Sequence, residues 1–269
     1  MWRRVLIIIA AVLLTAGVGF LLFPTISNFI GQQRANSVIA EYSEALDHVI
    51  DGENDLGITA ETYEEALEKG EIDKEGYPID QSGNRTADYT ITFRVDIDRL
   101  YRDSKAYNAS LIHHQGTVDT INYGSAALDL SRYGIPNNQY GYLSAPSIDM
   151  SLPVYLGAND YVMSFGAAHL NGTSLPIDEK NTNVAIAGHT GYIGRIFFDN
   201  IHRLNLGDRV SFTNYRETID YEVVDYKSVS PRDTGDLYIQ DGRQLLTLIT
   251  CTPDGYGGFA RYLVICEKK

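Results

Sequence analysis

Residues 205–230 read NLGDRVSFTNYRETIDYEVVDYKSVS, and this stretch decides the fold class. Its opening residues, NLGD, are a turn signal, and residues 209–215 then read as a strand. After a short break, residues 218–230 alternate apolar and polar side chains over a longer span. A period of two is typical of a β-strand with one buried face, so we predict two successive strands here.

Six further short runs bounded by turn residues predict six more strands. These are residues 142–149, 152–157, 161–168, 183–188, 245–251 and 261–267, with one short helical piece around the sequence RIFFDNIHRL. Eight strands with almost no helix between them favour a closed or nearly closed barrel. We therefore predict a mainly β protein whose residues 143–269 form an eight-stranded β-barrel with short helices.

The segment that precedes the barrel, residues 25–142, predicts a helical and acidic appendage. Apolar spacing predicts a helix over 33–50 and another within DIDRLYRDSKAYNASLIHH, and DYTITFRV alternates as a short strand between them. Glycines limit any helix in the stretch 51–80 to AETYEEALEKG. Residues 113–142 are rich in Gly, Asn and Tyr without a clear period, which indicates a long ordered loop packed on the rest of the protein.

The N-terminus predicts a single membrane-spanning anchor. Residues 5–23 carry no charge and follow Arg3 and Arg4, and nineteen residues are enough to cross a hydrocarbon core of about 30 Å. No small-x-small cleavage site follows them, which favours a retained signal anchor over a removed leader. The positive-inside rule keeps the arginines cytoplasmic. We predict a cytoplasmic stub and anchor over residues 1–24, with the rest of the chain outside the cell membrane.

The net charge of the chain limits the classes of molecule that it is expected to bind. The formal net charge is -13, which argues against a nucleic-acid partner and against anionic lipid. Between residues 51 and 80 there are eleven acidic residues and two lysines, so much of the acidity belongs to one segment. A solvated surface insertion is the simplest interpretation of such a segment.

The two cysteines, Cys251 and Cys266, are predicted not to pair. If 245–251 and 261–267 are neighbouring antiparallel strands, Cys251 faces Arg261 and Cys266 faces Leu246. At about 3.3 Å per residue the two backbones are about 16 Å apart, whereas a disulfide needs less than about 7 Å. We expect Cys251 to be a free thiol and Cys266, within the apolar run YLVIC, to be a core residue.

Three residues at strand ends carry the candidate chemistry: His189, Cys251 and Arg261. His189 ends an apolar strand before a glycine-rich loop, Cys251 ends LLTLITC, and Arg261 opens the next strand. Each alone is more often structural. Together they supply what acyl transfer by a thiol needs, namely a nucleophile, an imidazole that moves protons, and a cation for a developing oxyanion.

At these residues the chain resembles the sortase family, the cysteine transpeptidases of Gram-positive cell surfaces. The resemblance is carried by TLITC, by Arg261 ten residues after Cys251, and by His189 62 residues before it. The stretches LPVYLGA, GAAHLNGTSLP, NTNVAIAGHTG and DTGDLYI extend it through the barrel and look most like the pilin-polymerising branch, class C.

The resemblance implies roles for these residues and partners for the chain. Cys251 would attack the Thr–Gly carbonyl of a Leu-Pro-x-Thr-Gly-like sorting signal, His189 would protonate the leaving amine, and Arg261 would bind the oxyanion. Independently of the resemblance, strand alternation points Thr250 away from Cys251, so we expect its hydroxyl to have only a minor substrate-positioning role, and we interpret His169 as structural. The acyl acceptor would be a pilin lysine or a peptidoglycan precursor. We predict no cofactor and no metal ion.

Two features depart from that branch. No proline follows an aspartate, so the Asp-Pro-aromatic lid motif is missing, although 113–142 occupies the place of a lid and DTINYGS or LDLSRYG would supply a plug. The chain stops at CEKK, where many members of the branch carry a second membrane helix.

Three other interpretations stay open. A papain-like peptidase would place Cys before His and at a helix N-terminus, an order and element that this chain lacks. A non-catalytic surface β domain would bind a ligand without chemistry. A housekeeping sortase would anchor proteins to peptidoglycan.

Overall fold

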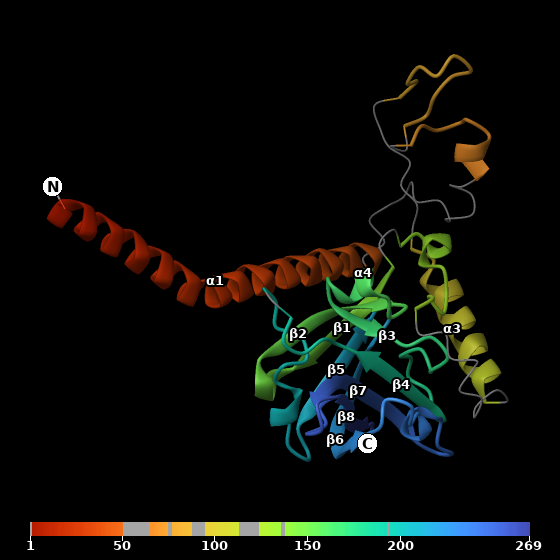
Figure 1. The fold of residues 1–269 in the computed structure, drawn as a ribbon. Coiled ribbons are helices and arrows are strands. Elements are labelled where there is room, and N and C mark those ends of the chain that lie inside the picture. The colour runs from red at the N-terminus through yellow and green to blue at the C-terminus, as the bar shows by residue number, and fades with distance from the viewer. Residues whose placement is uncertain are drawn as a thin grey trace.

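In the computed structural model the chain is described over residues 2–50, 65–74, 77–87, 95–112, 124–135, 138–192 and 194–269, with only the backbone described for 44–50. A long N-terminal helix runs out from a β-barrel, and a small segment, residues 65–74 and 77–87, is drawn away from the barrel (Figure 1). The barrel contains the candidate catalytic residues.

The eight strands close into one barrel, as predicted. Its order is β1-β2-β3-β4-β7-β8-β6-β5, with β5 returning to β1. The β2–β3 and β4–β7 pairs are parallel and the others are antiparallel. The strands are β1 (Gln139–Ala145), β2 (Met150–Leu156), β3 (Ala167–His169), β4 (Thr182–Ala187), β5 (Arg209–Asn214), β6 (Thr218–Val229), β7 (Gln244–Pro253) and β8 (Phe259–Glu267).

The sequence patterns explain how the strands are buried. In β6 the side chains of Ile219, Tyr221 and Val223 are buried while their neighbours are less so, which is the predicted alternation. Strand β7 is buried over its first seven residues because β4 and β8 pair with its two edges and its side chains pack on both faces, Leu246 and Leu248 in a large apolar cluster and Ile249 in a small one. It becomes exposed at Cys251. Among the described residues the larger of two apolar clusters includes Leu143, Val154, Ile186, Leu248, Val264 and Cys266, and a smaller one includes Leu170, Ile249 and Leu263.

Short helices connect the strands. They are α4 (Asp160–Met163) and the 3₁₀ turns Pro146–Ile148, Ile201–Arg203 and Gly235–Leu237, while a further 3₁₀ turn, Leu130–Tyr133, precedes β1. The helix expected around RIFFDNIHRL is the 3₁₀ turn Ile201–Arg203.

Two predicted strand boundaries are wrong for local reasons. The strand predicted over 161–168 is instead α4 followed by β3, because Asn159 caps the helix by accepting a hydrogen bond from the Val162 amide at 3.0 Å. The strand predicted over 142–149 ends at Ala145, because Pro146 opens a 3₁₀ turn and Asp149 is left-handed with φ 53°.

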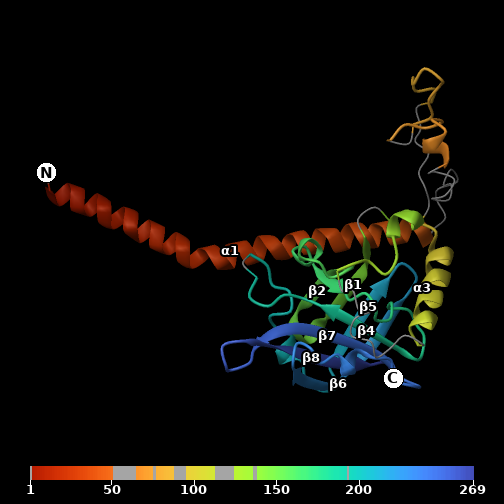
Figure 2. The same cartoon turned by 45° about the vertical axis from the view of Figure 1, so that its right-hand side comes forward.

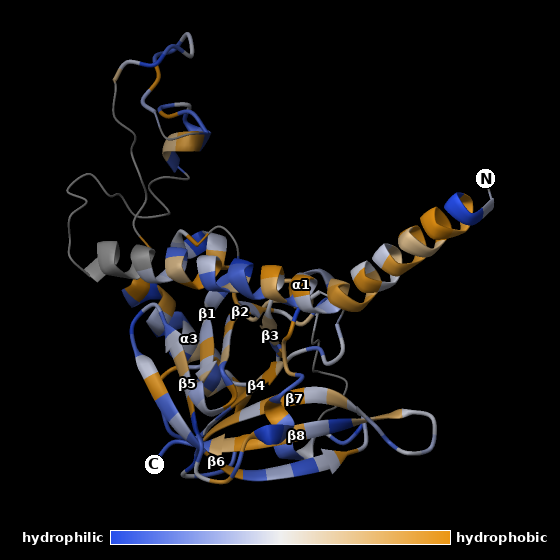
Figure 3. Cartoon of the chain, turned by 90° about the vertical axis from the view of Figure 1, so that its left-hand side faces the viewer, coloured by the Kyte–Doolittle hydropathy of each residue, from blue (hydrophilic) through white to orange (hydrophobic). Residues whose placement is uncertain are grey.

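Helix α1 (Trp2–Ile50) contains both the predicted anchor and the helix expected over 33–50, joined without a break. Its N-terminal half projects away from the barrel (Figures 1 and 2), and past its first turn that half is largely hydrophobic (Figure 3). Length and composition make it a candidate membrane span. Pro24 lies inside the helix, which bends between its two halves (Figure 2).

The C-terminal half of α1 packs on the barrel. Ala35 and Tyr42 are buried, and the Tyr42 hydroxyl donates a hydrogen bond of 3.1 Å to the carbonyl of Tyr140. Helix α3 (Ile97–Leu111), the helix expected after DYTITFRV, covers another side, and Asp96 caps it through the Arg99 amide. The strand expected from DYTITFRV falls outside the described residues except at its end, and of AETYEEALEKG residues 65–68 are helical.

Candidate active site

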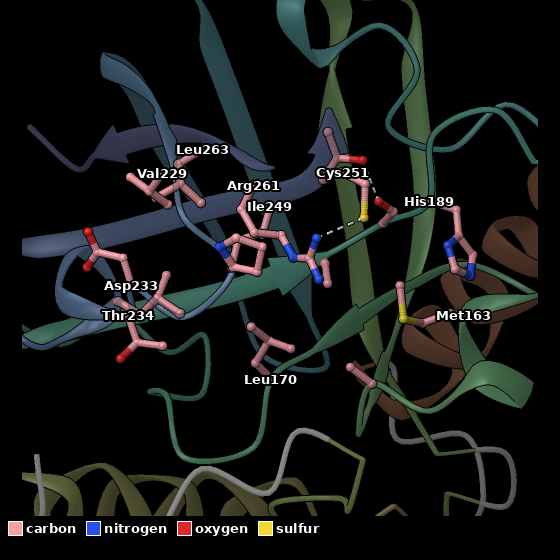
Figure 4. A pocket seen from close by; sticks show the side chains of 16 residues that line it. Met163, Leu170, His189, Val229, Asp233, Thr234, Ile249, Cys251, Arg261 and Leu263 are labelled. Atoms are coloured by element: carbon pink, nitrogen blue, oxygen red, sulfur yellow. Dashed lines mark hydrogen bonds between the residues drawn. The ribbon is translucent and has the colours of Figure 1, made fainter. Parts of the chain in front are cut away.

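The three candidate residues line one pocket. Cys251, Arg261 and His189 come from β7, from β8 and from the loop after β4, and they border a cavity of about 300 Å³. Figure 4 places Cys251 between Arg261 on one side and His189 on the other. The barrel therefore brings together the three chemical groups that the sequence analysis singled out.

The β7–β8 hairpin sets the distance between the thiol and the guanidinium. Cys251 and Arg261 are directly paired across the two strands, and Arg261 Nη1 donates to Cys251 Sγ at 3.4 Å. Asp254 pins the turn between them by accepting hydrogen bonds from the amides of Tyr256 (2.8 Å) and Gly258 (2.9 Å). Because Cys251 is solvent-exposed, its sulfur is open to a substrate as well as to this cation.

The parallel β4–β7 pair places His189 level with Cys251. Thr182 pairs with Gln244 and Ala187 with Ile249, and every partner in this ladder is 62 residues further along the chain. The Gly188 amide continues the ladder by donating to the carbonyl of Ile249 at 3.0 Å. The same offset applied to His189 gives Cys251, so the sequence spacing is the register of a parallel strand pair.

Aromatic rings and backbone contacts hold His189. Its imidazole stacks on Tyr192 with centroids 5.3 Å apart and an interplanar angle of 13°, and Phe197 packs against both rings. The Phe198 amide donates to the carbonyl of His189 at 2.9 Å. The orientation of the imidazole therefore depends on the loop that follows it.

Thr250 connects β7 to that loop. Its hydroxyl donates to the carbonyl of Gly188 at 2.8 Å and shares a 2.6 Å contact with the hydroxyl of Thr190. These are the two residues that flank His189. The Thr250 hydroxyl is therefore engaged with the histidine loop from the buried side of the strand.

The remaining walls of the pocket are residues that the sequence analysis did not single out. They are mostly apolar, with two polar residues at the end away from Cys251 (Figure 4). Apolar members include Met163, Leu170, Val229, Leu237, Ile249 and Leu263, and the polar pair is Asp233 and Thr234. No pattern in the sequence separates such side chains from those of the barrel core.

The other predictions about side chains are confirmed in part. Cys266 is fully buried, faces Leu246 and is not disulfide-bonded, and burial raises its pKa to about 12. His169 is fully buried and outside the pocket lining, with Nε2 3.0 Å from the carbonyl of Ser174. Burial lowers the pKa of His169 to about 4, so it is neutral and structural.

The described part of the expected lid lies elsewhere. Within 128–134, Leu130 and Tyr133 are buried in the core, and the Tyr133 hydroxyl donates to Asp103 of α3 at 2.7 Å. None of the described residues 124–135 lines the pocket, so the prediction that LDLSRYG plugs it is wrong. The other candidate, DTINYGS, falls mostly outside the described residues. Among described side chains there is no cluster of three or more His, Cys, Asp or Glu suited to a metal ion.

Comparison with known proteins gives one family. A family model described as the sortase domain matches residues 143–269. Sortase D of Bacillus subtilis is 28% identical over 130 residues, which span 48% of this chain and 63% of the relative. Sortase A of Staphylococcus aureus is 35% identical over 115 residues, spanning 41% and 54%. The matches thus cover between half and two thirds of these curated relatives.

Solved structures match over a longer part of the chain. A pilus-related sortase C of Group B Streptococcus is 32% identical with a TM-score of 0.55, covering 64% of this chain and 89% of that one. Sortase C-3 of Streptococcus pneumoniae is 31% identical with a TM-score of 0.56, covering 64% and 82%. A sortase C1 of Streptococcus agalactiae has a TM-score of 0.58 at 28% identity, covering 65% and 90%.

Proposed function

This chain belongs to the sortase family, whose known members are cysteine transpeptidases, and we propose that it is a membrane-anchored member of that kind. It would cleave an LPxTG-like sorting signal between Thr and Gly and pass the acyl group to an amine. The observation that carries the proposal is the exposed Cys251 thiol, 3.4 Å from the Arg261 guanidinium and level with His189.

In the first step the Cys251 thiolate attacks the Thr carbonyl carbon, a C–S bond forms, and negative charge develops on the carbonyl oxygen. Arg261 is proposed to bind that oxygen, because its fork of N–H donors already reaches the sulfur to which the carbon becomes attached. Donors aimed at developing charge lower the barrier more than contacts made equally with the substrate.

In the second step the C–N bond to glycine breaks. His189 is proposed to give its proton to the departing amine, leaving a Thr–Cys251 thioester and a neutral imidazole. The incoming amine then attacks the thioester, loses a proton to His189 and expels the thiolate. The stacking of His189 on Tyr192 supports this role, because a general acid must be held in reach of both amines.

The apolar wall of the pocket is proposed to receive the Leu and Pro side chains of the sorting signal. Leu170, Ile249 and Leu263 lie along it, and burying an apolar side chain there contributes about 25 cal/mol for each Å² removed from water. Thr250 is proposed to position the signal indirectly, through its hydrogen bond to the residue before His189.

For the acceptor we propose a lysine of a pilin subunit. The support is the likeness to structures whose names refer to a pilus, a pilus-related sortase C (32% identical) and a sortase C1 of a pilus island (29% identical). The candidate span in α1 supports a location at the cell membrane with the barrel outside. Transfer to a peptidoglycan precursor, the housekeeping alternative, differs only in the amine that is used.

The test is a search for the acyl-enzyme. The full chain in detergent micelles is incubated with an LPxTG peptide and examined by intact-mass spectrometry, beside Cys251→Ala and the matched control Cys266→Ala. We expect an adduct, released by hydroxylamine, on the wild type and Cys266→Ala but not on Cys251→Ala. Lysine-bearing and peptidoglycan-derived amines then compete for the acyl group. An unmodified wild type would favour the non-catalytic binding domain.

A further inference from the structure

Helix α1 touches the loop that carries His189. A Cβ atom added at Gly31 would lie 2.4 Å from the carbonyl oxygen of Gly194 and 2.8 Å from Arg195 Cγ. In the other direction, a Cβ at Gly194 would lie 2.9 Å from Ser27 Oγ. All three distances are below the 3.0 Å that real Cβ atoms keep, and the shortest is to a backbone atom, so a side chain at Gly31 would require the helix or the loop to move. Gly194 also needs to be glycine because its φ is +89°.

The touching face continues down the helix. Ser27, Gly31 and Ala35 are spaced four residues apart, which puts them on one side of α1, and Gly31 and Ala35 are buried. At about 1.5 Å per residue, Ser27 and Gly31 lie roughly 6 to 12 Å beyond the last residue of the apolar run, Phe23. The contact is therefore made by the first turns of the helix outside the membrane span.

The loop transmits this contact to His189. We define the His189 loop as residues 188–192 and 194–199. One carboxylate, that of Asp199, closes it by accepting from the amides of Gly191 (2.7 Å) and Phe197 (3.0 Å). The amide of Arg195 donates to the carbonyl of Tyr192, the residue on which the imidazole stacks. The part that touches α1 is thus joined by one backbone hydrogen bond to Tyr192, the residue whose ring stacks on His189.

We propose that Ser27 and Gly31 of α1 are positioning residues for His189. The inference rests on the proposed transpeptidase function and adds that the anchor helix, beyond the membrane, forms the outer support of the catalytic loop. A glycine-rich loop has conformational freedom that must be removed before a general acid can be held in place. Backing it with a helix that is itself packed on β2 restricts that freedom.

The test compares two glycines of the same helix. Gly31→Ala adds a methyl group against the Gly194 carbonyl, whereas at Gly19 a Cβ meets nothing within 4 Å, so Gly19→Ala is the matched control. Both full-length variants are placed in micelles and followed by hydrogen exchange of the loop amides. We expect faster exchange at residues 191, 195, 197 and 198 in Gly31→Ala only, with the β5–β6 amides unchanged as evidence that the barrel is folded.

Turnover supplies the second measurement. Because a misplacement of about 1 Å costs up to about 100-fold, we expect kcat of Gly31→Ala to fall about ten- to hundredfold, with a changed pH–rate profile. The KM for the sorting peptide should change little, because the apolar wall of the pocket comes from other elements. If Gly31→Ala does not fold, Ser27→Val, which enlarges the side chain facing Gly194, takes its place.

The possible results distinguish the inference about α1 from the proposed transpeptidase function. Unchanged loop exchange, or faster exchange with unchanged kcat and pH profile, overturns the inference and leaves the transpeptidase proposal intact. A wild-type chain that forms no acyl-enzyme defeats the proposed function, while the exchange comparison still decides whether α1 holds the loop.

Discussion

Replacing Arg261 by glutamine should slow acylation without unfolding the barrel. Arg261 Nη1 lies 3.4 Å from Cys251 Sγ. An oxyanion held at a similar separation from the guanidinium is stabilised, relative to the uncharged carbonyl, by about 1 kcal/mol in bulk water and by about 5 kcal/mol at an effective dielectric of about 20. These energies correspond to rate factors of about tenfold and a few thousandfold.

The solvent exposure of Cys251 and Arg261 favours the lower of these two rate factors. Cys251 is exposed and Arg261 only partly buried, so water screens their interaction. We therefore expect Arg261→Gln to lower the kcat/KM for acylation by about ten- to hundredfold, with a smaller loss in Arg261→Lys, which keeps the charge but not the planar fork.

The assay is stopped-flow acylation of the full chain by an LPxTG peptide at low and high salt. The wild-type rate should fall as salt rises, and the rate of Arg261→Gln should depend on salt less steeply. Thermal unfolding monitors the fold of both variants. An Arg261→Gln chain that acylates within threefold of the wild-type rate would refute the assignment of Arg261 as the oxyanion cation.

Two further predictions concern buried groups. The pKa of His169 is lowered to about 4 by burial from an ordinary 6.5, so the unfolded chain takes up a proton first as pH falls. The free energy of unfolding should therefore decrease by up to about 3 kcal/mol between pH 6.5 and 4, and His169→Gln should flatten that slope in urea titrations; an unchanged slope would contradict it. Thiol titration should find one reactive cysteine in the native chain, Cys251, and two after denaturation, because Cys266 is fully buried. Two native thiols would mean that the β8 register is wrong.

Local sequence patterns were enough to predict much of the barrel and the pairing of two of the three candidate residues, Cys251 and Arg261. In an antiparallel hairpin, residues at equal distances from the turn pair with each other. The pairing of Cys251 with Arg261, and of Cys266 with Leu246, could therefore be predicted from the sequence alone. The failures were local too. Residues 161–168 were predicted to be a strand, but Asn159 caps a short helix, α4, at their start. Periodicity over four residues cannot distinguish a helical turn from a strand.

The pocket walls lay beyond sequence reasoning. Met163, Leu170 and Val229 face the thiol's cavity, while similar side chains nearby fill the core. Which apolar residue lines a cavity depends on how the elements pack. In the sequence, an apolar residue that lines a cavity looks the same as one that fills the core. The contact between Gly31 and Gly194 is equally invisible, because both glycines have other possible reasons to be present.

By itself the sequence determined most of the strands, the membrane-like N-terminal run and the Cys251–Arg261 pair, since each depends on periodicity or on a short antiparallel connection. Only the tertiary structure decided that β4 lies parallel to β7, which makes the 62-residue interval to His189 a strand register, and that α1 reaches the His189 loop. The physical reason is that non-local pairings are selected by the packing of the whole barrel, whose closure no local pattern encodes.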